Sequence, residues 1–364
     1  MRSLILLPIA FLFCYTAKAQ AKVAGDRFIL NGRLEDRDTG RIILSYADKD
    51  GNWISDTARL SKGSFSFTGK IKEPTLASLQ GHINSRSVDD PDFTEIFLEP
   101  VHMNILVREN DFKHASVLGS RTQQEMDSLN KKKAMIYREN SPGSAIKSGA
   151  VQKQLRDADL LFIQEHPDSY VSAYLLTSFV NRMSGDSVES LYSTLSLPVQ
   201  NSLFGMRVHT ALAAEKATTI GSMAPDFSQK EIGGNTITLS SFRGKKYVLL
   251  DFWASWCAPC RDIVPELKEL HQQYTGKGLV IVGISLDMNK PSWKKAIAED
   301  GIASWKNIFG GLSHTDKADN IIARYNVQPI PDLFLIDSNG VIIGRYRSAP
   351  AIGELKQKLA EVFR

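Results

Sequence analysis

A pair of cysteines separated by two residues constrains this chain more than any other feature. Cys257 and Cys260 follow an apolar run, residues 248–252, that has the length and composition of a buried strand. After Cys257 the spacing of apolar residues becomes helical, as at Ile263 and Leu267. We therefore expect Cys257 at the start of a helix and Cys260 one turn inside it. Cα atoms three residues apart on a helix lie about 5 Å from each other, which permits a disulfide.

The position at a helix start predicts different roles for the two sulfurs. Unpaired N–H groups and the helix dipole stabilise a thiolate there, so we expect a lowered pKa for Cys257. Cys257 is then the exposed nucleophile, and Cys260 is the shielded thiol that resolves the mixed disulfide. A structural zinc site needs four ligands, and beyond residue 19 the chain has no second cysteine pair and no tight histidine pair. A redox pair is the favoured interpretation, because a structural disulfide that closes so short a loop adds little stability.

Several motifs around the cysteines resemble a known family. Residues 251–261, DFWASWCAPCR, are similar to the thioredoxin signature. Residues 221–227 and 241–245 resemble the opening of the TlpA/ResA-type extracytoplasmic thioredoxins, which belong to the AhpC/TSA-Redoxin superfamily. Residues 330–337 resemble the family's cis-proline turn and the strand after it. The resemblance covers about residues 219–364, and it implies a thiol:disulfide oxidoreductase that uses no cofactor.

The resemblance also implies a catalytic role for Asp251, six residues before Cys257. Asp251 lies in a buried strand, so its pKa is expected to be raised, and it is implied to accept the proton of Cys260 through water. A hydrogen-bonded turn carboxylate without a chemical role is the alternative. Pro265 falls inside the active-site helix, where it is expected to remove a hydrogen bond and kink the axis.

A partner-binding surface is implied around the cysteines. Pro331 is implied to be cis and to lie beside Cys257, where the backbone of Ile330 can pair with an extended substrate. Trp253 is compatible with a place in the core instead of this surface. The other residues implied to contact a partner flank the first sulfur, namely Trp256, Ala258 and Pro259.

Two residues depart from the family pattern. Ile263 stands two residues before the helix proline, where relatives usually carry Glu, so an acid that tunes the thiol pKa is missing. Asp332 follows the cis-proline, where relatives often have Thr. A carboxylate near the sulfurs is expected to raise the pKa of Cys257.

Residues 1–19 have the pattern of a secretory signal peptide. A charged start is followed by an apolar run, residues 4–13, that is too short to span a membrane, and then by an A-x-A ending at Ala19. Cleavage after Ala19 removes Cys14. A lipoprotein with a lipid on Cys14 is the alternative, but the bulky residues 11–13 before it argue against lipidation. The expected location is the periplasm or cell envelope, an oxidising compartment.

Residues 20–118 predict a small all-β domain, a sandwich or a barrel. Strand-like runs occur at residues 28–30, 41–46, 64–68 and 101–107, with turn signals between them. The region resembles, more weakly, the small β domain of unknown function that often precedes such thioredoxin modules. We expect no metal site, because the histidines of this region lack ligand spacing, namely His82, His102 and His114.

The rest of the chain predicts a helical connector, residues 119–218, and an α/β thioredoxin-like domain, residues 219–364. Connector helices are expected at 123–138, at 145–165, after the capping segment 166–169, at 187–195 and at 199–216. In the last domain a central mixed sheet flanked by helices is expected. Its further strands are predicted at 236–239, 279–285, 332–337 and 341–346, and its further helices from Pro291, at 315–325 and at 351–363.

The sequence predicts a periplasmic thiol:disulfide oxidoreductase that reduces protein disulfides. A membrane thiol-disulfide electron donor would re-reduce it, as for relatives that serve cytochrome c maturation. The formal net charge of +4, or +2 once Arg2 and Lys18 are removed, gives no indication of nucleic-acid binding. One alternative is an envelope binding protein with an accessory thioredoxin module. Another is a thiol peroxidase, but Ala254 and Leu250 stand where peroxiredoxins carry Thr or Ser and Pro.

Overall fold

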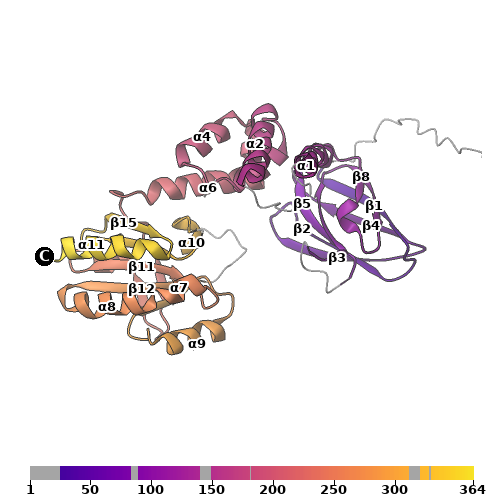
Figure 1. The fold of residues 1–364 in the computed structure, drawn as a ribbon. Helices are drawn as coiled ribbons and strands as arrows, with labels where there is room; N and C mark the ends of the chain where they lie inside the picture. The colour runs from indigo at the N-terminus through magenta and orange to yellow at the C-terminus, as the bar shows by residue number, and fades with distance from the viewer. Residues whose placement is uncertain (1–24, 83–88, 140–148, 181, 311–319, 328) are drawn as a thin grey trace, which may run out of the picture. The chain divides into compact units, whose positions relative to one another are not determined.

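The computed structural model describes residues 25–82, 89–139, 149–180, 182–310, 320–327 and 329–364 (Figure 1). The chain divides into two compact units. One contains the residues up to 162 with 169–171, and the other contains residues 163–168 and 172–364. The predicted signal peptide lies outside the described residues. Among the helices that the structure describes, none combines the length and apolar character that crossing a bilayer requires.

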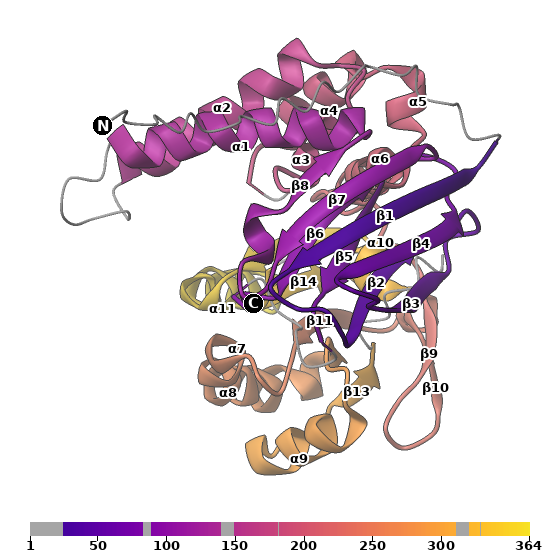
Figure 2. The same ribbon diagram turned by 90° about the vertical axis from the view of Figure 1, so that its right-hand side faces the viewer.

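Two four-stranded sheets build the all-β part of the first unit (Figure 2). The strand orders are β4-β1-β7-β8 and β3-β2-β5-β6, and β1 runs antiparallel to β4 but parallel to β7. Their bounds are β1 Arg27–Glu35, β2 Arg41–Ala47, β3 Trp53–Arg59, β4 Ser64–Lys70, β5 Thr75–Gln80, β6 Phe93–Leu98, β7 His102–Arg108 and β8 Ser116–Leu118.

One apolar core lies between these sheets. Along β7 every second side chain is buried, as at Met103 and Ile105, and β2 contributes Ile42 and Leu44 to the same core. The arrangement is a β-sandwich, so the expected all-β fold is confirmed. Four of its strands, β3, β5, β6 and β8, were not among the predicted runs. No side chain of β3 is fully buried, and β8 has only three residues.

The region between the two sheet domains is helical, as predicted, but two of the predicted helices differ in their bounds. Its helices are α1 Arg121–Glu139, α2 Gly149–Glu165, α3 Tyr170–Thr177, α4 Gly185–Thr194, α5 Leu197–Gln200 and α6 Leu203–Ala217. The predicted helix 199–216 is two helices, because Ser202 accepts the N–H of Gly205 at 3.1 Å and begins α6 anew. The predicted start of the second helix, residues 145–148, lies outside the described residues.

A five-stranded mixed sheet organises the second unit, in the order β13-β12-β11-β14-β15. The first three strands are parallel to one another, β14 runs antiparallel to β11, and β15 runs antiparallel to β14. The bounds are β11 Tyr247–Trp253, β12 Leu279–Ser285, β13 Lys306–Phe309, β14 Asp332–Ile336 and β15 Ile342–Arg347, with a separate hairpin of β9 Ser228–Lys230 and β10 Thr236–Thr238. This is the mixed α/β sheet that the thioredoxin resemblance implies.

Helices flank this sheet, and short 3-10 helices connect the elements. The helix α11, Ile352–Val362, packs near β15 at one edge of the sheet (Figure 1). The helix α9, Lys290–Asp300, lies beside β13 at the other edge (Figure 2). Of the predicted helix 315–325, residues up to 319 lie outside the described residues, and α10 is Ile321–Arg324. The 3-10 turns are residues 112–114, 239–242, 275–277 and 349–351.

The helix after the cysteines is broken and not merely kinked. The helix α7 is Ala258–Asp262, Ile263 ends it, and α8 is Val264–Tyr274. Pro265 therefore occupies the first turn of α8, where a missing N–H costs nothing, instead of the interior of one long helix. The predicted cost of Pro265 is avoided by starting a second helix.

Candidate active site

The two cysteines lie at the carboxyl end of β11, the central strand. The chain turns after Trp253, and the N–H of Cys257 donates to the carbonyl of Ala254 at 3.0 Å. Cys257 is the N-cap residue of α7, and it forms a disulfide with Cys260 (S–S 2.01 Å, Cα–Cα 5.3 Å). The N–H of Cys260 also donates to Sγ of Cys257 at 3.2 Å. A backbone donor therefore points at the sulfur that is expected to carry the negative charge.

The expected difference in exposure between the two sulfurs is wrong for this oxidised state. Cys257 is only 5% exposed and Cys260 3% exposed. Cys257 turns back toward the helix start, where its sulfur meets the Cys260 N–H and is bonded to the buried Cys260. Its neighbours Trp256, Ala258 and Pro259 are exposed instead, with Trp256 at 63%.

Asp251 lies in the middle of β11, opposite Gly283 of β12 and Leu333 of β14. It is 3% exposed, and burial raises its pKa from 3.8 to about 7. Its Oδ1 has no hydrogen-bond partner among the described residues. This geometry does not match the alternative of a hydrogen-bonded turn carboxylate.

The Ile330–Pro331 peptide bond is cis, as the resemblance implies. The N–H of Ser348 donates to the Pro331 carbonyl at 3.1 Å, which fixes the turn to the segment after β15. Since the next residue, Asp332, lies opposite Phe252 near the end of β11, the cis-proline turn is at the same edge of the sheet as the cysteines. The fold thus brings together two segments that are more than 70 residues apart in the sequence.

Asp332 is not the free carboxylate that the sequence analysis assumed. It is fully buried, its Oδ2 lies 2.6 Å from Arg345 and 3.7 Å from Arg347, and burial raises its pKa while the two arginines oppose that rise. Asp251 is opposite Leu333, the neighbour of Asp332, so the two carboxylates project from opposite faces of the sheet. With its charge paired, Asp332 loses the expected reason to raise the pKa of Cys257.

Two hydrophobic positions near the pair are part of the core. Ile263, between α7 and α8, is 3% exposed and belongs to the apolar cluster of the sheet. Trp253 is 2% exposed, and its Nε1 has no hydrogen-bond partner among the described residues. The interpretation of Trp253 as core is confirmed.

Sequence reasoning missed the polar contacts on both sides of the cysteines. Asp287, just beyond β12, accepts hydrogen bonds from Ser255, two residues before Cys257. Arg261, just after Cys260, pairs with Asp300 at 2.6 Å at the end of α9. The signal available in the sequence was that parallel strands end at one edge, so a carboxylate directly after β12 falls near the turn after β11.

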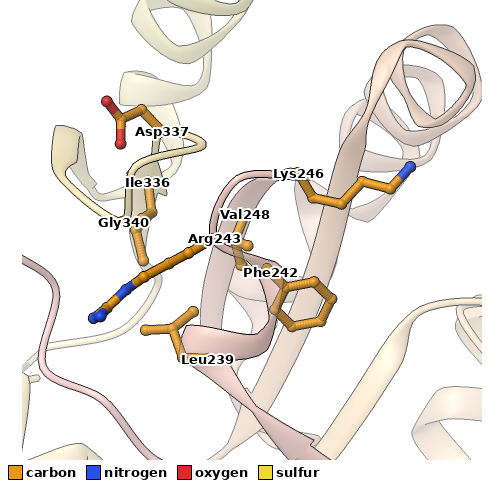
Figure 3. Close-up of a pocket in the computed structure, with 8 residues that line it drawn as sticks. All are labelled: Leu239, Phe242, Arg243, Lys246, Val248, Ile336, Asp337 and Gly340. Carbon is orange, nitrogen blue, oxygen red and sulfur yellow. The ribbon is translucent and has the colours of Figure 1, made fainter.

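A small pocket lies away from this site (Figure 3). Its lining combines the start of β11 with the hairpin between β14 and β15, and it includes Arg243 and Lys246. Val248 is at the opposite end of β11 from the cysteines, so the pocket is not the redox site. Within the described ranges, histidine, cysteine and acidic side chains form no group of three suited to a metal ion.

Comparisons with known proteins agree with this arrangement. The profile of the AhpC/TSA family matches residues 220–345, and that of a domain of unknown function, DUF4369, matches residues 28–126. The thiol-disulfide oxidoreductase ResA of Geobacillus kaustophilus is 35% identical over 150 residues, which are 41% of this chain and 82% of that relative. ResA of Bacillus cereus is 28% identical over 173 residues, 47% of this chain and 95% of the relative. A solved thioredoxin domain of a thiol-disulfide oxidoreductase from Bacteroides vulgatus is 31% identical with a TM-score of 0.34, covering 38% of this chain and 96% of that one.

Proposed function

Because the chain belongs to the ResA-like thiol-disulfide oxidoreductases of the AhpC/TSA family, we propose that it is an extracytoplasmic reductase of protein disulfides that acts through Cys257 and Cys260. The observation that carries the proposal is the Cys257–Cys260 disulfide at the carboxyl end of the central strand, with the Cys260 N–H directed at the Cys257 sulfur.

The reaction begins from the reduced pair. The thiolate of Cys257 attacks one sulfur of a substrate disulfide and forms a mixed disulfide, and the other substrate sulfur leaves as a thiolate that takes up a proton. The thiolate of Cys260 then attacks Cys257, releases the second substrate thiol and closes the Cys257–Cys260 disulfide. In total two electrons pass from the protein to the substrate, and the two released substrate thiolates take up one proton from Cys260 and one from solvent.

The order of attack follows from the hydrogen bond to Cys257. The Cys260 N–H stabilises negative charge on the Cys257 sulfur, whereas among the described residues no hydrogen-bond donor reaches the sulfur of Cys260. Cys260 is held one turn away in α7, so its attack on the mixed disulfide is intramolecular and fast.

Asp251 is the proposed proton acceptor for Cys260. A carboxyl group whose pKa is about 7 exchanges a proton near neutral pH, which a carboxyl group at its ordinary pKa of 3.8 does poorly. Its Oδ1, which has no partner among the described residues, can accept a hydrogen bond from a water molecule that relays this proton.

The substrate contacts the exposed residues around the pair. Trp256, Ala258 and Pro259 form the surface next to Cys257, and the backbone of Ile330 before the cis-proline is the proposed partner of an extended substrate strand. Met288, which is 67% exposed and follows Asp287, adds an apolar side chain that the sequence analysis did not include.

The N-terminal pattern supports the proposed location in the periplasm or envelope, because a signal peptide ending at Ala19 would direct export. We propose that a membrane thiol-disulfide electron donor there returns the pair to its reduced form. The β domain of residues 20–118, the helical connector 119–218 and the redox domain 219–364 remain our proposed division of the chain.

Trapping of mixed disulfides tests the proposal. In cells, Cys260→Ser is expected to accumulate long-lived mixed disulfides through Cys257, while Cys257→Ser is expected to trap almost none. Insulin reduction should be lost in both variants. Non-reducing electrophoresis with mass spectrometry identifies the trapped species, and equal trapping by the two variants would contradict the assigned roles.

Trapping and a peroxide assay together separate the alternatives. Absence of trapping by either variant favours an envelope binding protein with an accessory redox module. Rapid peroxide consumption by the wild type would favour a peroxidase, which Ala254 and Leu250 argue against.

A further inference from the structure

Asp287 is a buried carboxylate that holds the turn in front of the reactive cysteine. It is 2% exposed and is the second residue after β12. Its Oδ2 accepts the backbone N–H of Ser255 at 2.9 Å, and its Oδ1 accepts the Ser255 hydroxyl at 2.6 Å. The hydroxyl of Ser285 donates to Oδ2 at 2.7 Å. All three donors are neutral, and Asp287 forms no ion pair within the described part of the chain, so only the dipoles of these donors stabilise its charge.

The fold explains why this contact forms. Trp253 lies opposite Ser285 at the ends of the parallel strands β11 and β12, and the N–H of Leu286 donates to the Trp253 carbonyl at 2.8 Å. Two residues beyond this pair on each strand are Ser255 and Asp287, which therefore lie next to each other. Asp287 therefore reaches the turn at a point two residues before Cys257.

The same crossover segment also reaches the residue after the second cysteine. Arg261 donates from Nε to both carboxylate oxygens of Asp300 at 3.0 and 3.1 Å, and from its terminal nitrogen to Glu299 at 3.0 Å. The segment from Asp287 to Asp300 thus holds the Cys-Ala-Pro-Cys turn at both ends, and it engages the charge of Arg261.

We propose that Asp287 is a positioning residue of the redox pair: it fixes the turn that carries Trp256 and Cys257, and its buried negative charge disfavours the Cys257 thiolate. The proposal rests on the proposed function of Cys257 and Cys260. A charge that disfavours the thiolate destabilises the reduced protein, which makes the pair a stronger reductant.

The test is the equilibrium constant between the protein disulfide and glutathione, measured for the full chain. Asp287→Asn removes the charge but keeps a carbonyl acceptor for Ser255. It is expected to shift the equilibrium about tenfold toward the reduced protein, which corresponds to about 30 mV for a two-electron couple. Asp287→Ala removes the anchor as well, so it should show the same shift and, in addition, slower reduction of insulin at saturating substrate. Other charged groups on the neighbouring elements, Asp251, Arg261 and Asp332, are unchanged in both variants.

Asp337→Ala is the matched control. Asp337 also accepts two backbone N–H groups, from Asn339 at 2.9 Å and Val341 at 2.8 Å, but it lies at the opposite end of the sheet from the cysteines. The Asp337→Ala variant should have a lower unfolding temperature than the wild type and the same glutathione equilibrium. The inference is overturned if Asp287→Asn stays within twofold of the wild type, or if Asp337→Ala shifts the equilibrium equally. Failure of the wild type to exchange with glutathione would instead overturn the proposed function.

Discussion

Replacing Asp251 by asparagine is expected to remove a pH dependence of stability that this carboxyl group imposes on the fold. Burial raises the pKa of Asp251 from 3.8, the value for the unfolded chain, to about 7. A group whose pKa is raised by folding stabilises the folded state fully below pH 3.8. That contribution is lost as the pH rises toward 7, because the unfolded chain releases the proton first.

The magnitude follows from the separation of the two pKa values. Between 3.8 and about 7 lie about three pH units, and each corresponds to 1.36 kcal/mol, so the wild type loses about 4 kcal/mol across this range through Asp251 alone. Asp251→Asn cannot ionise. Its free energy of unfolding relative to the wild type should therefore rise by about 4 kcal/mol from pH 4 to pH 8 and stay level above that.

Urea unfolding of both oxidised proteins at a series of pH values measures this difference, and the disulfide excludes thiol titration. Four of the five tryptophans lie in the second unit, so fluorescence in a Trp53→Phe background reports on that unit alone. A constant offset between the proteins reflects packing of the amide and carries no information about charge. A difference that changes by less than about 1 kcal/mol between pH 4 and pH 8 would refute the reasoning, and with it Asp251 as a proton acceptor near neutral pH.

Three further predictions concern other parts of the chain. Ile263→Glu should change the pH dependence of Cys257 alkylation, with Ile263→Gln as the uncharged control, and identical profiles for all three proteins would mean that position 263 does not act on the sulfurs. Arg345→Met should lower the free energy of unfolding by about 3–5 kcal/mol, because it leaves the buried Asp332 without its closest partner. The double variant with Asp332→Asn should lose less, and a single variant as stable as the wild type in urea would refute this argument. N-terminal sequencing of exported protein should begin at Gln20, and a lipid on Cys14 would contradict that cleavage site.

The sequence alone predicted the fold class and the disulfide between the two cysteines, and the structure has both. An apolar strand followed by Cys-x-x-Cys and helical spacing predicts a strand-turn-helix unit, and the structure has β11, the turn and α7 in that order. Such motifs are local, so their interactions are set by residues close together along the chain. The cis-proline at Pro331 was also predictable, since its motif resembles that of the family.

Local patterns failed where neighbours from other segments decide the outcome. Cys257 is predicted to be exposed from its position at a helix start, but its exposure depends on where its sulfur turns and on the bond to Cys260. Asp332 has no basic residue close to it in the sequence. Only the antiparallel pairing of β14 with β15 brings Arg345 next to its carboxylate.

The tertiary structure alone decided which groups surround the cysteine turn. Ser255 and Asp287 are 32 residues apart, and nothing in the sequence marks them as partners. They meet because β11 and β12 are parallel and end together. Arg261 and Asp300 meet because α9 returns to the same side of the turn, 39 residues later. Hydrogen bonds and buried charges act over a few ångströms, so their partners are set by strand order and register, which no single stretch of residues specifies.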